Sequence, residues 1–196
     1  MAAQFIQRIA LGILAALLVA VVAAQIVLLR THPVAHGSIS WSSDPSGKCP
    51  QFQPAETTAR CSEVAFAPGE AVGVGFSVRN TSPLSMTVMS VASVGSDSPT
   101  MLAELHPALL PVGAPLAIDR MRAFAPIDLA AGEEATIYLV GHVRSCDAVR
   151  GHWGPGTGVR FDVARVTVRW LLASSVVEMP LRDVLQIDAP AQGQCP

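Results

Sequence analysis

Hydrophobic residues follow two different patterns along this chain. From residue 9 to residue 29 they form a continuous run without a charged residue, and Gln25 is its one strongly polar side chain. Arg8 and Arg30 flank the run. At a rise of about 1.5 Å per residue, a helix of this length crosses a hydrocarbon core of roughly 30 Å. The pattern therefore predicts a transmembrane helix over residues 9–29.

A cleaved signal peptide is the alternative interpretation of this run. Arg8 supplies a basic segment, and the small residues at 22–24 resemble a weak cleavage site. The apolar run continues through residues 26–29, however, so cleavage at that point would leave an apolar stub on the mature protein. We therefore favour an uncleaved anchor.

Beyond the anchor, apolar and polar residues alternate with a period of two, which is typical of strands with one buried face. The runs lie at residues 71–79, 84–94 and 135–143. In the first run the apolar set is Val72, Val74, Phe76 and Val78. Asn80-Thr81-Ser82-Pro83 follows it as a turn signal.

The last two alternating runs, around residues 161–172 and 177–187, predict a β-hairpin. The first run changes phase between Val163 and Val166, and a bulge near Ala164 would explain the change. Pro180 cannot donate a backbone hydrogen bond, so we expect the second run to be an edge strand.

The middle of the chain is less regular. Prolines at positions 107, 111 and 115 exclude a long helix there. We expect residues 102–110 to form either a single helical turn or a loop on the sandwich. Because no helical period persists after the anchor, the fold class predicted is all-β, an antiparallel β-sandwich preceded by one transmembrane helix.

These patterns divide the chain into a short cytoplasmic tail (1–8), the anchor (9–29), a linker (30–43) and an extracytoplasmic domain (44–196). All 15 acidic residues lie from Asp44 onward together with 11 of the 13 basic residues, which gives the domain a net charge of about −4. This charge excludes an electrostatic footprint for nucleic acid. A short tail inside and the domain outside is the orientation that we expect at the cell membrane.

All four cysteines, Cys49, Cys61, Cys146 and Cys195, follow the anchor. An even number in an exported domain suggests two disulfides, and three pairings are open. We favour Cys49–Cys61 and Cys146–Cys195, with four reduced buried thiols as the alternative. The spacings match neither a zinc site nor a redox motif.

Three features together resemble the Ig-like domains of small membrane-anchored bacterial proteins. They are the strand-turn-strand pattern over 72–94, the segment 124–133 with its Pro-x-x-Leu-x-x-Gly-Glu sequence, and a strand ending at Cys146 before a terminal hairpin. The resemblance covers about residues 64–188 and implies an Ig-like sandwich. It implies no activity, since one fold serves many functions.

The segment 144–160 is the most distinctive loop of the domain. Loops at sandwich ends often serve recognition, so this segment is a candidate interaction loop. Its candidate contact residues are Asp147, Arg150, His152 and Trp153. The interpretation that we favour is a disulfide-pinned crossover in which Trp153 caps the core.

Other candidate sites are weaker. The turn with Asp128, Glu133 and Glu134 does not separate two carboxylates across a cleft as a glycosidase requires. Arg160, Arg165 and Arg169 suggest a basic strip or an ordinary solvent face, and Asn80-Thr81-Ser82 fits a glycosylation sequon. His32 and His36 are most simply solvated linker residues.

No sequence motif for hydrolysis, nucleotide binding or zinc proteolysis is present. We therefore expect a non-enzymatic protein without a cofactor or metal, which acts by contact with a protein partner as an accessory subunit of an envelope complex. The alternative function is an envelope ligand or copper carrier. Its ligands would come from Met86, Met89, Met101, Met121, His106 and His142.

Overall fold

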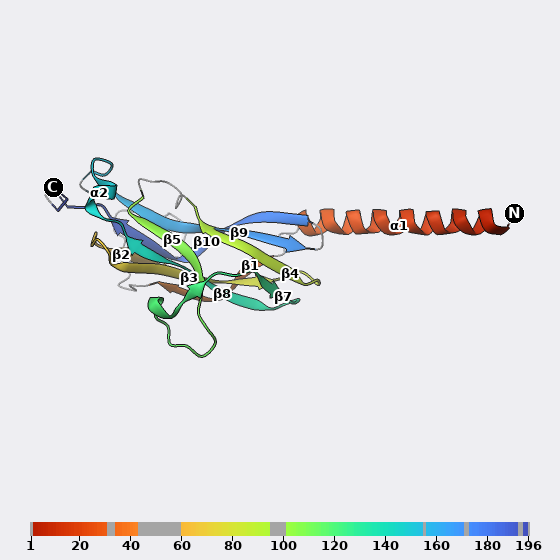
Figure 1. The fold of residues 1–196 in the computed structure, drawn as a ribbon, viewed down its shortest axis with the longest axis horizontal. Coiled ribbons are helices and arrows are strands. Elements are labelled where there is room, and N and C mark those ends of the chain that lie inside the picture. The colour runs from red at the N-terminus through yellow and green to blue at the C-terminus, as the bar shows by residue number, and fades with distance from the viewer. Residues whose placement is uncertain are drawn as a thin grey trace.

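One long helix and a two-layered β-sandwich make up the computed structural model (Figure 1). The structure describes residues 2–30, 34–42, 60–94, 101–154, 156–170, 173–191 and 194–195. Helix α1 (Ala2–Arg30) includes the predicted anchor and extends away from one end of the sandwich. Its apolar side chains, such as Leu14 and Leu18, are exposed, and the helix is long and apolar enough to cross a membrane. A helix with these properties is either a membrane anchor or a signal sequence.

Among the residues that the structure describes, ten strands form two five-stranded sheets. Sheet A contains, in spatial order, β1 (Val34–Ser42), β3 (Ala71–Asn80), β8 (Glu134–Val143), β5 (Ala103–Leu109) and β6 (Arg122–Ala123). Sheet B contains β2 (Arg60–Val64), β10 (Ala173–Asp188), β9 (Gly158–Trp170), β4 (Met86–Ser93) and β7 (Ile127–Leu129). The pairs are antiparallel except for β2 and β10, which run parallel. The predicted all-β sandwich is confirmed.

The core lies between the sheets and is built from alternate residues of each strand. Val74 and Val78 of β3 and Leu139 of β8 are fully buried, as the period-two pattern predicted. Phe161 and Trp170 of β9 meet them from sheet B. Burying one such side chain contributes about 1.5–3 kcal/mol before entropy is counted.

Strand β9 changes phase where the sequence predicted a bulge. Phe161 faces the core, and Ala164 faces it again three residues later. The ladder with β10 is irregular at the same place, because Pro180 pairs with Val163 and Leu185 pairs with Phe161. Between these two pairs β10 advances by five residues while β9 advances by two, so the extra residues of this irregularity lie in β10.

Strand β10 is not a simple edge strand, so that prediction was wrong in part. Its residues 183–187 pair with β2 on the side away from β9. Pro180 lies outside this paired segment. The missing proline donor is therefore tolerated where β2 does not reach.

Strand β5 corrects the expectation of a helical turn or loop over 102–110. Ala103 and Leu105 are buried while Glu104 and His106 are exposed, so the segment alternates as a strand does. Its Pro107 carbonyl accepts a hydrogen bond from the Phe124 amide just beyond β6. In an extended residue the nitrogen and the carbonyl point to the same side, so the proline nitrogen faces the short β6 rather than β8.

The linker predicted over residues 30–43 contains strand β1. Its ladder with β3 runs from Val34 opposite Asn80 to Ser42 opposite Val74, and Val34 is buried. The sandwich therefore includes residues 34–42 of this predicted linker. Alternation in β1 is obscured by a bulge between His36 and Ser40, where the register with β3 shifts.

The register of β1 and β3 defines the two ends of the sandwich. Val34 follows α1 after three residues and pairs with Asn80, so this is the anchor-proximal end. At the other end of β3, Ala71 pairs with His142. We call this the distal end; α2 and the C-terminus lie there in Figure 1, opposite α1.

Candidate interaction surface at the distal end

The predicted interaction loop begins where β8 leaves sheet A at the distal end. The Val143 amide donates to Glu70 O at 2.9 Å, and the Arg144 amide donates to Leu102 O at 2.8 Å. A single helical turn, α2 (Cys146–Val149), follows. These bonds fix the direction in which the chain leaves the sheet and place α2 beyond the strand ends.

Covalent and apolar contacts hold this loop against the sandwich. A disulfide joins Cys146 to Cys195, which is the pairing favoured from the sequence. Val149 is buried, and Trp153 is half-buried and packs against the core. The Trp153 position is the one that the crossover interpretation predicted.

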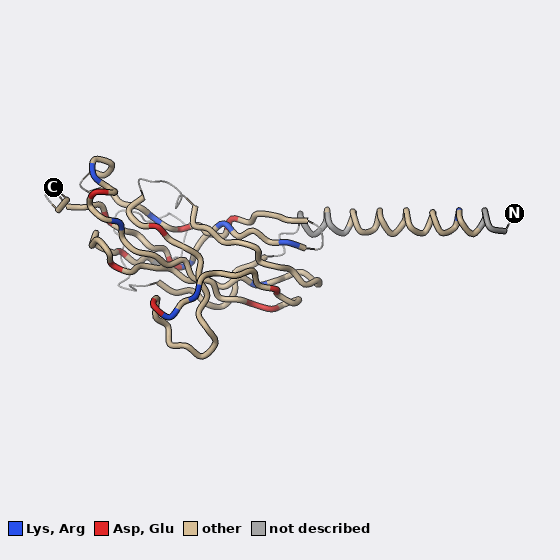
Figure 2. Tube along the Cα trace, in the orientation of Figure 1, with Lys and Arg blue, Asp and Glu red and all other residues tan. Residues whose placement is uncertain are grey.

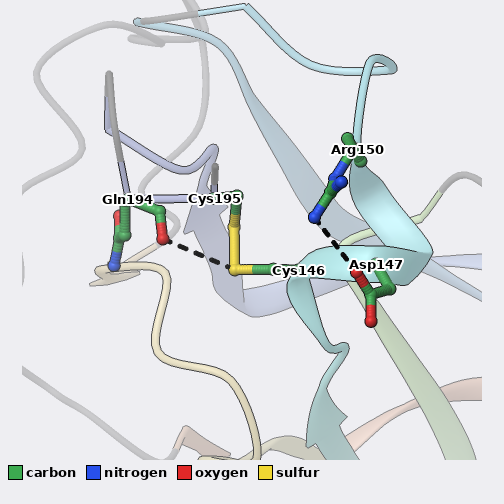
Figure 3. A network of polar contacts seen from close by, with 5 residues as sticks. All are labelled: Cys146, Asp147, Arg150, Gln194 and Cys195. Carbon is green, nitrogen blue, oxygen red and sulfur yellow. Dashed lines mark hydrogen bonds and ion pairs between the residues drawn. A yellow bond between two sulfur atoms is a disulfide. The ribbon is translucent and has the colours of Figure 1, made fainter.

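The C-terminal segment is fastened at the same place (Figure 3). The Gln194 side-chain amide donates to Phe66 O at 2.6 Å, and the Gln194 carbonyl lies 3.6 Å from Cys146 Sγ. The disulfide therefore ties together the loop after β8 and the segment after β10. The other predicted pairing involves Cys49, which lies outside the described residues.

Three of the predicted contact residues point to solvent. Arg150, which directly follows α2, donates from Nη2 to Asp147 Oδ1 at 3.2 Å, and these side chains are 59% and 90% exposed. His152 is exposed in the turn that follows. The loop thus presents an acid, a base and an imidazole on a short, pinned turn.

A second exposed surface was missed by the sequence analysis. Residues 110–121, here called the flap, connect β5 to β6 and end in the turn η1 (Ile118–Arg120), which packs near β3. Val112 at its tip is fully exposed and Leu116 is 46% exposed. Figure 1 shows the flap as the green loop that projects from the sandwich. The signal that would have found it is the uncharged stretch from residue 107 to 118.

The predicted copper ligands are not brought together. Met86 is buried in β4 near the anchor-proximal end, whereas His106 and His142 are exposed on β5 and β8. Within the described ranges, no group of three or more His, Cys, Asp or Glu side chains is arranged to hold a metal ion. His32 lies outside the described residues.

The turn carboxylates serve as local structural acceptors. Thr87 Oγ1 donates to Asp128 at 2.6 Å, and the Ala130 amide donates to Glu133 at 2.6 Å. Glu134 accepts two bonds from Ser38, which lower the pKa of its carboxyl together with Ser77 and Arg79. None of these three groups is left to face another across a cleft.

The predicted basic strip is interrupted by acids. Arg165 pairs with Glu178 at 2.9 Å, and Arg160 lies 3.4 Å from Asp162. Figure 2 shows basic and acidic segments next to one another along the described part of the sandwich. The glycosylation sequon is inaccessible in the folded domain, because Asn80 is fully buried.

A groove of about 370 Å³ separates β1 from β10 at the anchor-proximal end. Val34, Val177 and Met179 contribute apolar side chains, and His36 lies at its side. Burial, and secondly the charge of Arg182, lower the pKa of His36. The groove therefore favours the neutral imidazole.

Comparison with known proteins assigns no family to this chain. No protein-family model and no curated protein matches it. Among solved structures, it aligns with a Vibrio cholerae VesB protease at a TM-score of 0.35 and 11% identity, covering 85% of this chain and 35% of that one. It aligns with a PapD-like domain of human CEP192 at 0.32 and 13% identity, covering 80% and 99%. The CooA pilin subunit of enterotoxigenic Escherichia coli gives 0.28 and 12%, covering 65% and 88%.

Proposed function

We propose that this chain is a non-enzymatic, membrane-tethered extracytoplasmic β-sandwich that binds a protein partner through its distal end. The observation that carries the proposal is the pinned turn with Asp147, Arg150 and His152 exposed. The turn lies at the end of the sandwich opposite the anchor. A partner in the same membrane or at the cell surface could bind this end, because the sandwich itself does not stand between the distal end and its surroundings.

Rigidity of the turn favours binding. The disulfide to Cys195 and the buried Val149 hold α2 in one position, so little conformational entropy is lost when a partner docks. The exposed charges of Asp147 and Arg150 supply orientation and specificity more than affinity. This combination fits an accessory subunit of an envelope complex, whose partner is held nearby by the same membrane.

The absence of a catalytic arrangement among the described residues supports a binding role. Asp128, Glu133 and Glu134 are each engaged in turn or strand contacts. No cysteine among the described residues is a free thiol. Binding rather than group transfer is the chemistry that these side chains support.

Location outside the cytoplasm is supported by the disulfide. Disulfides persist in oxidising compartments and are rare in the cytosol. The Cys146–Cys195 bond links segments separated by 49 residues in the sequence, so it closes a large loop of the domain. An anchor formed by α1 would make the protein single-pass, with most of the chain on the oxidising side.

Site-specific photo-crosslinking in native membranes tests the proposal. A crosslinking residue at position 152 should capture one partner reproducibly, and the same residue at Ser174, which is exposed near the anchor, should not. Capture from position 112 of the flap alone would move the interface and overturn the distal-end assignment. Recovery of an uncrosslinked monomer from every position would overturn the binding function.

A triple variant, Asp147→Ala with Arg150→Ala and His152→Ala, completes the test. It should fold, because its three side chains are exposed, and it should lose most of the partner recovered from detergent extracts. The matched control is Arg165→Ala with Glu178→Ala, which removes an exposed ion pair from sheet B. Equal loss of the partner in both variants would contradict a contact at the distal end.

A further inference from the structure

We propose that a calcium ion binds on the outer face of sheet B and bridges β2 to β10 through Glu63, Gln186 and Asp188. This site is independent of the distal-end contact. No local sequence motif marks this set of residues, because they are far apart in the chain and one of them is an amide.

Register brings the three side chains to one face. Glu63 and Gln186 are direct partners in the parallel ladder. Their neighbours Val64 and Ile187 are buried in the core, so Glu63 and Gln186 point to the opposite face. Asp188 is two residues beyond Gln186 on the same strand and shares that face.

Direct contacts connect the three groups. Gln186 Nε2 donates to Asp188 Oδ1 at 3.2 Å. Glu63 and Asp188 also lie within hydrogen-bonding reach of each other. A cation bound between two such carboxylates would offset their mutual repulsion.

The unusual group is the amide oxygen of Gln186. The side chain is 3% exposed, and its Oε1 is a buried acceptor without a hydrogen-bond donor among the described residues. Leaving a buried acceptor without a hydrogen bond destabilises the folded protein. The Nε2 of the same planar amide already donates to Asp188, so the oxygen lies near that carboxylate, where a cation shared with Asp188 would satisfy it.

The donor set identifies the class of ion. Two carboxylates and an amide carbonyl are hard oxygen ligands, and calcium accepts such sets with irregular geometry. Arg160, which is opposite Gln186 on β9, lies 3.4 Å from Asp162 and adds positive charge nearby. With two carboxylates and this base, we expect a dissociation constant of about 10⁻⁴–10⁻³ M, the range of extracellular calcium modules.

A bound ion would act where sheet B is least supported. Strand β2 has five residues and pairs with β10 along one side only within the described sheet. A cation shared by Glu63 and Asp188 would clamp the end of β2 to the end of β10. Calcium outside the cell would therefore stabilise this edge of the sandwich.

The test uses the full chain in detergent after treatment with EDTA. Addition of about 10 mM calcium chloride should raise the thermal midpoint by about 3–6 °C, and titration calorimetry should show saturable binding near one ion per chain. Glu63→Gln should abolish the calcium-dependent rise. The matched control, Glu178→Gln on β10, should keep it.

Two results would overturn the proposal. No calcium binding and no thermal shift in the unaltered chain would mean that Glu63 and Asp188 share a proton instead. An equal shift in Glu63→Gln and Glu178→Gln would place the ion elsewhere. The Glu63→Gln variant should fold, because the substitution removes the repulsion between two carboxylates. Without calcium, its thermal midpoint should equal or exceed that of the unaltered chain.

Discussion

At the scale of single residues, Asn80 fixes two turns at the anchor-proximal end. Its side-chain amide donates to Leu84 O at 2.8 Å, Leu129 O at 3.0 Å and Ala130 O at 3.1 Å. Its Oδ1 accepts from the amide and hydroxyl of Ser82 at 2.9 and 2.8 Å. One buried side chain thereby joins the β3–β4 turn to the β7–β8 turn.

We expect Asn80→Ala to lower the free energy of unfolding by about 3–5 kcal/mol, because it leaves the buried Leu129 carbonyl without its donor and removes the other hydrogen bonds of a fully buried side chain. Asn80→Asp should cost at least as much, since a carboxylate has no N–H to donate. Thr81→Ala is the exposed control and should stay near the unaltered value. Urea unfolding measures all three, and an Asn80→Asp variant as stable as the unaltered chain would contradict the donor role.

Glu134 links pH to the stability of β1. Hydrogen bonds from the Ser38 hydroxyl and amide, each 2.7 Å, hold its pKa below the ordinary 4.5. A carboxyl with a depressed folded-state pKa stabilises the fold above pH 4.5, and this contribution disappears as the pH falls through the folded value.

We therefore expect Glu134→Gln to be less stable than the unaltered chain at pH 6 and to approach it below pH 4. The group is exposed, so the difference should be small. Chemical denaturation across this pH range measures it. A constant difference at all pH values would show that ionisation of Glu134 is not the cause.

At the scale of elements, β5 depends on one close approach to β8. Gly141 is opposite Leu105, and a Cβ at Gly141 would lie 1.8 Å from Glu104 O. Because the obstructing atom is backbone, the two strands would have to separate. We expect Gly141→Ala to lower the thermal midpoint by about 10 °C or more, whereas Gly154→Ala, which meets open space, should change it little. Similar midpoints for both variants would contradict the close approach.

Sequence patterns predicted the elements whose alternation is uninterrupted. The sequences of β3 and β8 alternate over about ten residues, so their core-facing residues could be identified directly, although both strands also bury residues of the opposite face. β5 was missed because Pro107 interrupts a short run, and whether that proline breaks a strand depends on which neighbour its nitrogen faces. β1 was missed because a bulge after His36 resets its phase. The effect of Pro107 on β5 and the phase of β1 both depend on pairing with strands distant in the sequence, which a local pattern does not reveal.

For the candidate surface too, local sequence predicted some features and tertiary packing decided the others. Covalent chemistry identified Cys146 and Cys195, and loop position identified the exposed Asp147 and Arg150. Local sequence did not decide the burial of Trp153, since a tryptophan beside glycines suits either a core cap or a contact residue. Only packing against the core settled it.

The disulfide stabilises α2 and the C-terminal segment together. Cys146→Ser with Cys195→Ser should lower the free energy of unfolding by about 2–4 kcal/mol, since the bond spans 49 residues and restricts the unfolded chain. The segment after β10 should also become sensitive to limited proteolysis. Mass spectrometry of early fragments checks this, and an unchanged fragment pattern would mean that Gln194 and its bond to Phe66 O suffice to hold the segment.

At the scale of the whole molecule, the two ends of the sandwich have different surroundings. The anchor-proximal end contains the Asn80 turns and the groove beside Val34, and the distal end contains α2 and the disulfide. If α1 stays attached, it fixes which end faces the partner. The proposed contact therefore depends on the anchor as much as on the loop.

Retention of α1 is the prediction that tests this dependence. We expect the protein from native membranes to resist alkaline carbonate extraction and to have the intact mass of 20.5 kDa, because cleavage after residue 24 would leave Ile26 and its apolar neighbours at a solvent-exposed terminus. Protease added to intact spheroplasts should digest the domain and spare α1. A soluble product that lacks residues 1–24 would identify α1 as a signal sequence. The distal end would then no longer be oriented by a membrane, and a freely diffusing binder would replace the tethered subunit.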